Sequence, residues 1–78
     1  NYAGWITFPK SRGTLLNIDM PRIKTDNLIY TYVEPGVIMK QAENLLDGSC
    51  SVVFWDKSYQ KIEEVFELLK YVQPLVIV

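Results

Sequence analysis

The sequence predicts an α/β (or α+β) domain in which an N-terminal β-hairpin precedes a βαβαβ unit, giving a mixed sheet of about five strands with two helices. Short runs of aromatic and β-branched residues alternate with segments of helical periodicity, and the second half of the chain follows the order strand, helix, strand, helix, strand. Hydrophobic residues make up 49% of the 78 residues and charged residues 22%, which is the balance of a globular chain with one core. Residues 1–78 are therefore expected to form a single small domain.

The hairpin is expected from two strand signals on either side of a turn. Residues 5–8 are aromatic or β-branched and end at Pro9, and residues 10–13 supply the polar and glycine chemistry of a turn. In residues 16–20 apolar and polar side chains alternate strictly. This period of two predicts a strand whose buried face carries Leu16, Ile18 and Met20.

The βαβαβ unit is expected from residue 28 onward. The apolar, tyrosine and threonine run 28–33 predicts its first strand, 50–55 its second and 75–78 its third. A helix is predicted between Gly36 and Gly48, where the apolar residues that share a face are Ile38, Ala42, Leu45 and Leu46. A second helix is predicted over 59–72, with an apolar face formed by Ile62, Val65, Phe66 and Leu69. Strands joined by helical crossovers pair in parallel, so a parallel sheet is expected.

The residue types present exclude several kinds of site. The chain has no histidine and one cysteine, Cys50, so it offers neither a tetrahedral zinc site nor the Ser-His and Cys-His pairs of hydrolases. We therefore expect no cofactor and no catalytic activity of its own, unless the chain is part of a larger enzyme. A lone cysteine favours a reducing, intracellular and cytoplasmic location. No apolar run reaches the length of a membrane-spanning helix, so no membrane partner is expected.

Aromatic residues are the most suggestive feature that remains, at 13% of the chain. Tyr30 and Tyr32 fall on one face of the predicted strand 28–33, and Trp5 lies in the N-terminal strand. Tyrosine and tryptophan are enriched at interface hot spots, and a domain of this size gains stability when it packs against a partner. These residues predict a protein-interaction or assembly module that binds a protein partner or itself through a sheet edge or an aromatic face. The alternative is that both faces of the strand are covered by the domain's own helices and hairpin.

The apolar run 75–78 at the end of the sequence leaves two interpretations open. One is that the chain is a fragment of a longer protein. The other is that it is a complete small protein whose last strand is central in its sheet.

Two acids follow predicted strands and suggest a metal site as an alternative function. Glu34 follows the strand 28–33 and Asp56 follows 50–55, and in a parallel sheet both would emerge at the same edge, where two carboxylates and water suit Mg²⁺. The other interpretation is that each acid caps the start of a helix.

The stretch Tyr32-Val33-Glu34-Pro35-Gly36 resembles the Toprim domain of topoisomerases and primases, in which a glutamate ends the first strand of such a unit. The resemblance covers residues 28–78, and the aspartate pair that binds metal in that family would begin where this sequence ends. It implies a metal-dependent subdomain that processes nucleotides or nucleic acids.

A third interpretation is nucleic-acid binding through the basic hairpin. Lys10 and Arg12 lie in the predicted turn, close to the aromatic residues Trp5 and Phe8, and Arg22 and Lys24 add two further positive charges. Turns are also commonly basic because they are solvated. The sequence pI of about 5.2 is far below that of a dedicated nucleic-acid-binding domain.

Overall fold

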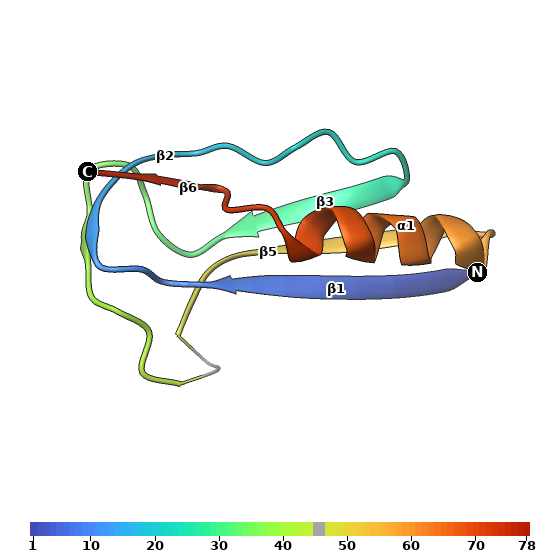
Figure 1. Ribbon diagram of the computed structural model, residues 1–78, viewed down its shortest axis with the longest axis horizontal. Helices are drawn as coiled ribbons and strands as arrows, with labels where there is room; N and C mark the ends of the chain where they lie inside the picture. The colour runs from blue at the N-terminus through green and yellow to red at the C-terminus, as the bar shows by residue number, and fades with distance from the viewer. Residues whose placement is uncertain (45–46) are drawn as a thin grey trace.

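The computed structural model describes residues 1–44 and 47–78, and it has six strands and one helix in those ranges. The chain order is β1 (Tyr2–Pro9), β2 (Gly13–Ile18), β3 (Asp26–Thr31), β4 (Ile38–Met39), β5 (Gly48–Asp56), α1 (Tyr59–Lys70) and β6 (Leu75–Ile77) (Figure 1). The strands form two three-stranded sheets, with the orders β1-β5-β3 and β4-β2-β6, and every pairing is antiparallel.

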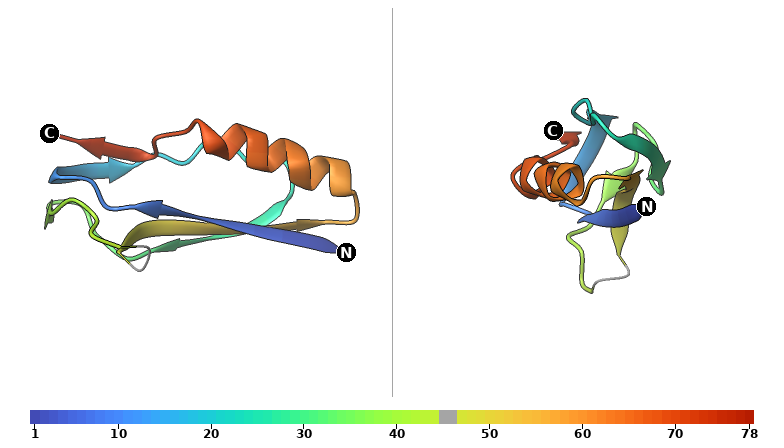
Figure 2. Two further views of the ribbon diagram at one scale, coloured as in Figure 1. Left: turned by 60° about the horizontal axis from the view of Figure 1, so that its bottom comes forward. Right: turned by 90° about the vertical axis from the view of Figure 1, so that its right-hand side faces the viewer.

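The molecule has two layers. One layer is the β1-β5-β3 sheet, and α1, β2 and β6 lie together on one side of it (Figure 2). Helix α1 lies over β1 and β5, and its buried residues are Ile62, Val65 and Leu69. These join the fully buried Leu15, Val52 and Phe54 in one core between the layers. The predicted apolar face of this helix is thus confirmed at three of its four positions, and Phe66 is partly exposed.

The predicted βαβαβ unit and its parallel sheet are wrong, because the helix expected between Gly36 and Gly48 does not form over the described part of that segment. Gly36 has a φ of 95°, and its N–H donates to the Leu15 carbonyl at 2.7 Å, while the N–H of Leu15 donates to the Val37 carbonyl at 2.9 Å. These bonds draw the chain alongside β2, where it forms the short β4. Met39 is buried and Ile38 is exposed there, which is the period of a strand. Leu45 and Leu46, which contributed to the predicted helical face, lie outside the described residues.

The predicted N-terminal hairpin is also wrong, although both of its strands exist. β1 pairs with β5 along its whole length, and β2 pairs with β4 and β6 in the other sheet. The predicted inward face of β2 is wrong at Leu16, which is 53% exposed, whereas Leu15 is fully buried. An irregularity in the β2–β6 register between Leu15 and Asn17 shifts the alternation by one residue there.

The absence of a parallel βαβαβ unit removes the structural basis of the Toprim resemblance. That resemblance needs Glu34 at the end of a strand whose parallel neighbour follows a helical crossover, and here β3 and β5 are antiparallel.

In the part of the chain that the structure describes, no helix is long and apolar enough to cross a membrane.

Candidate functional site

The two faces of the β1-β5-β3 sheet differ in what covers them. Side chains alternate between the faces along each strand, so the register assigns every residue to one face. Phe54, Val52 and Cys50 of the central strand are fully buried, in the same core cluster as Leu15 of β2 and the apolar residues of α1. The residues between them point to the opposite side, which no described element covers (Figure 2). We call this second side the open face.

The open face consists of three cross-strand rows. The register places Trp5, Val53 and Leu28 side by side in the central row, with Thr7, Ser51 and Tyr30 in one flanking row and Ala3, Trp55 and Asp26 in the other. Directly opposed side chains in antiparallel strands are about 5 Å apart, so each row is a continuous surface. Tyr32, just beyond the end of β3, extends the open face past Ser51.

Large apolar side chains dominate the exposed part of this face. Trp5 is 70% exposed, Tyr32 60%, Leu28 53% and Tyr30 47%, while Val53 and Trp55 are half-buried. All three residues that the sequence singled out for protein binding, Trp5, Tyr30 and Tyr32, therefore lie on one surface. Their role in binding remains a prediction.

Sequence reasoning missed the other apolar members of the open face. Leu28 has the same strand parity as Tyr30, so it could have been included. Val53 and Trp55 lie in a continuously apolar run that predicted a strand covered on both faces. Only the register shows that one of those faces is uncovered.

A hydrogen-bonded group of hydroxyls holds Tyr32 in place at one end of the open face. The Tyr32 hydroxyl lies 3.2 Å from Ser51 Oγ and donates to it, and Ser51 Oγ lies 2.8 Å from Thr7 Oγ1 on the neighbouring strand. The Tyr32 ring passes close to Gly48, where a Cβ would stand 3.7 Å from the ring. An aromatic side chain fixed in this way loses little conformational entropy when a partner covers it.

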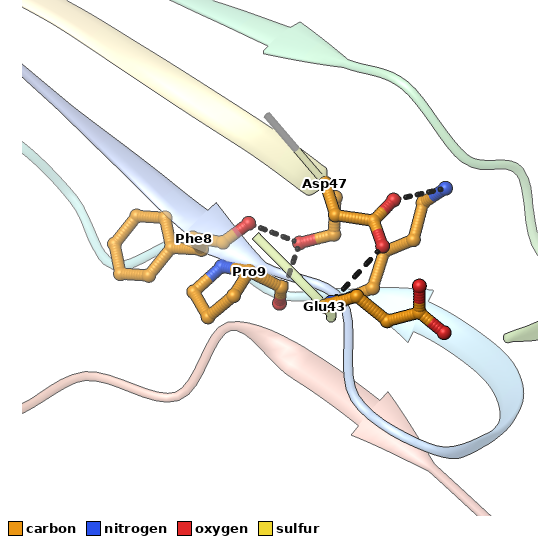
Figure 3. A network of polar contacts seen from close by, with 6 residues as sticks. Phe8, Pro9, Glu43 and Asp47 are labelled. Atoms are coloured by element: carbon orange, nitrogen blue, oxygen red, sulfur yellow. Dashed lines mark hydrogen bonds and ion pairs between the residues drawn. The ribbon is translucent and has the colours of Figure 1, made fainter. Parts of the chain in front are cut away.

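A second polar network, shown in Figure 3, fixes the connection that enters β5. Ser49 Oγ donates to the carbonyl of Phe8 at 2.8 Å, where the β1–β5 register shifts between Phe8 and Pro9. Asp47 accepts from the Glu43 N–H at 3.3 Å and forms an ion pair with Lys10 at 3.3 Å. The Glu43 N–H and the Lys10 ammonium both lower the pKa of Asp47. This network is structural, because its groups satisfy one another.

The structure does not bring the two predicted metal ligands together. Asp56 ends β5, whereas Glu34 follows β3, whose last residue, Thr31, pairs with Cys50 near the start of β5. The six residue-to-residue steps from Cys50 to Asp56 put about 20 Å between the two ends of the sheet. Asp56 instead accepts from the Ser58 N–H at 2.8 Å, next to the start of α1. Among the described residues no group of three or more Cys, Asp or Glu side chains is placed to hold a metal ion.

The four basic residues proposed for nucleic-acid binding divide between two ends of the molecule. Lys10 and Arg12 lie in the β1–β2 connection, and Arg22 and Lys24 lie in the β2–β3 connection at the other end of β2 (Figure 1). Lys10 is also paired with Asp47. The four charges therefore do not form one patch.

No protein-family model matches this chain, and neither a curated protein nor a solved structure is significantly similar to it.

Proposed function

We propose that this chain is a non-catalytic protein-interaction module that self-associates, with a second copy packed on the open face. The single observation that carries the proposal is the contiguity of exposed apolar side chains on that face: Trp5 and Leu28 flank Val53 in one row, and Tyr30 and Tyr32 continue the surface. Isolated exposed apolar residues are ordinary, whereas contiguous ones mark interaction surfaces.

The area of the open face fits a small symmetric dimer. At the exposed fractions of Trp5, Leu28, Tyr30 and Tyr32, these side chains present roughly 500 Å², which lies within the range of functional patches on monomers. Two copies facing each other would bury about 1,000 Å² in total, which is the lower limit for a specific interface. We therefore expect a reversible dimer with a dissociation constant in the micromolar range.

The charge of the molecule is compatible with association of two copies. Asp26 is the only charged residue in the three rows, and it is the first residue of β3, at the margin of the open face, where a partner can leave it hydrated. The net charge of the whole chain is −1, so long-range repulsion between two copies is weak. A two-fold axis through the face would bring apolar rows into contact and bury no unpaired charge.

The open face is a better candidate for the dimer interface than the edges of the sheet. β1 and β3 are both edge strands of their sheet, so a partner strand could pair with either one. Edge pairing would use backbone groups and leave Trp5, Tyr30 and Tyr32 in water. Packing face to face covers these side chains, and their burial supplies most of the favourable free energy.

Sedimentation equilibrium over concentrations that span the micromolar range tests the proposal. We expect a monomer–dimer equilibrium whose dissociation constant rises at least tenfold in the Trp5→Thr/Tyr30→Thr variant, because threonine keeps the strand preference and removes the aromatic area. Ile38→Thr is the matched control, since Ile38 is 80% exposed on a strand of the other sheet. A wild-type chain that stays monomeric throughout, or a control variant that dissociates as much as the double variant, contradicts the proposal.

The cellular setting belongs to the same proposal. The single cysteine is fully buried at Cys50, which supports an intracellular, reducing compartment for the module. Recovery of the native protein with Cys50 in a disulfide to a partner chain would contradict this placement.

A further inference from the structure

A cleft of about 410 Å³ lies on the helix side of the molecule, away from the open face, between the β2–β3 connection and α1. Three basic side chains line it: Arg22 and Lys24 come from the connection, and Lys61 comes from the first turns of the helix. None of the three forms an ion pair with another described residue, since the ion pairs present join Lys10 to Asp47 and Lys70 to Glu67. The cleft thus brings together three cations from two elements far apart in the sequence.

The rest of the lining adds an unsatisfied hydroxyl and an apolar wall. Thr25 lines the cleft and is only 5% exposed, and its Oγ1 is buried without a hydrogen-bond partner. A buried hydroxyl without a hydrogen-bond partner in the protein is unusual, so Thr25 adds a polar group with unused hydrogen-bonding capacity to the wall of the cleft. Val65 and Leu68 of α1 supply apolar surface beside the charges.

We propose that this cleft binds a small organic phosphomonoester, with the phosphate held by Arg22, Lys24 and Lys61 and the organic part resting on Val65 and Leu68. Guanidinium and ammonium groups form the strong, charge-assisted hydrogen bonds that phosphate oxygens accept.

Glu64 sets a limit on the ligand. Its carboxylate lies on the same rim and accepts from Gln60 at 3.4 Å, so one negative charge opposes the three positive ones. This arrangement suits a single compact anion. Binding of a nucleic-acid backbone would need a longer track of cations, and Lys10 and Arg12 lie at the other end of β2.

The test is a titration of the full ¹⁵N-labelled chain, followed by NMR, with phenyl phosphate, inorganic phosphate and sodium chloride at matched ionic strength. We expect saturable shifts at Thr25, Lys24 and Lys61 with both phosphates and tighter binding of phenyl phosphate, because only its ring reaches the apolar wall. Sodium chloride should give small, non-saturating shifts.

Variants separate a built site from general charge attraction. Arg22→Ala/Lys61→Ala should abolish saturable binding, and Glu64→Gln should tighten it about threefold by removing the opposing charge. Lys40→Ala/Lys57→Ala is the matched control: it removes two exposed charges outside the cleft and should bind as the wild type does.

Three results would overturn the proposal: non-saturating shifts with phenyl phosphate, unchanged binding in Arg22→Ala/Lys61→Ala, or an equal loss in the control. The open face takes no part in this cleft, so the proposal and self-association can fail independently.

Discussion

Substituting alanine for Gly4 tests how closely α1 packs on the sheet. Gly4 lies on β1 opposite Phe54, and a Cβ placed there would be 2.7 Å from Cζ of Phe66 and 3.0 Å from Cζ of Phe54. Both contacts are shorter than the usual carbon–carbon separation of about 3.5 Å, so one ring has to move. Phe54 is fully buried and has no space, whereas Phe66 is 37% exposed and can turn toward solvent.

The cost of that movement can be worked out from the contacts it breaks. Phe66 and Phe54 pack edge to face, with ring centroids 5.0 Å apart and an interplanar angle of 75°. Losing that geometry costs about 0.5–1.5 kcal/mol, and overpacking in general costs about 1–3 kcal/mol. Replacing glycine by alanine in a strand interior stabilises the folded state by about 0.5–1 kcal/mol, because alanine loses less backbone entropy on folding. We expect Gly4→Ala to lower the free energy of unfolding by about 1 kcal/mol.

The same substitution in a Phe66→Ala background should have the opposite sign. With the Phe66 ring gone, its contact at 2.7 Å is removed, and the Phe54 ring can relieve the remaining contact at 3.0 Å by shifting into the space that Phe66 leaves, so the entropy gain of about 0.5–1 kcal/mol decides the sign. Urea unfolding followed by circular dichroism measures both differences. For a domain of this size they correspond to a fall of roughly 1 M in the wild-type midpoint and a smaller rise in the Phe66→Ala midpoint. An effect of the same sign and size in both backgrounds would show that Phe66 does not lie over Gly4.

Three further predictions concern Cys50, Asp47 and Ser58. The Cys50 thiol is fully buried and desolvation raises its pKa, so iodoacetamide should modify it far more slowly in the folded chain than in urea; equal rates would place it at the surface. Hydrogen bonding from Glu43 and the Lys10 charge lower the folded-state pKa of Asp47. The stability linked to Asp47 is therefore present above its ordinary pKa of 3.8 and is lost as the pH falls through its folded value, so Asp47→Asn should unfold less steeply in acid than the wild type. An acid titration identical to that of the wild type would contradict this role. Ser58 accepts from the Lys61 N–H at 3.4 Å as the N-cap of α1, so Ser58→Ala should cost about 1 kcal/mol of unfolding free energy and Ser58→Asp much less; equal losses would exclude capping.

Local sequence patterns predicted where most elements lie but not how the strands pair. The helix expected over 59–72 is α1, and the runs 50–55 and 75–78 correspond to β5 and β6. These three predictions are correct because the periodicity of a segment depends only on its own residues. Strand pairing depends on contacts between distant segments: β5 pairs with β1, whose residues lie 39 to 54 positions earlier in the chain, and no pattern within either strand specifies that partner.

The absence of the predicted helix over residues 37–44 explains the error in the overall fold. The spacing of Ile38 and Ala42 fits the apolar face of a helix. Backbone hydrogen bonds between Gly36 and Leu15, however, place this segment beside β2, where it forms the strand β4. Without a helical crossover, β3 and β5 have no reason to be parallel. The candidate metal pair Glu34 and Asp56 depended on parallel strands and therefore does not form.

Only part of the open face could be predicted from the sequence. The parity of Tyr30 and Tyr32 is a local property and places them on one side of β3. That Trp5 joins them follows only from β5 lying between β1 and β3, which is a tertiary fact.

The most direct test of the central claim is a concentration series of NMR spectra of the ¹⁵N-labelled chain. If a second copy packs on the open face, the amide shifts of β1, β3 and the central residues of β5 will move together as the concentration rises, with the largest changes at Trp5, Leu28 and Tyr30. The strands β2, β4 and β6 should not change. Shifts that do not depend on concentration, or that map to the β4-β2-β6 sheet, would contradict the account.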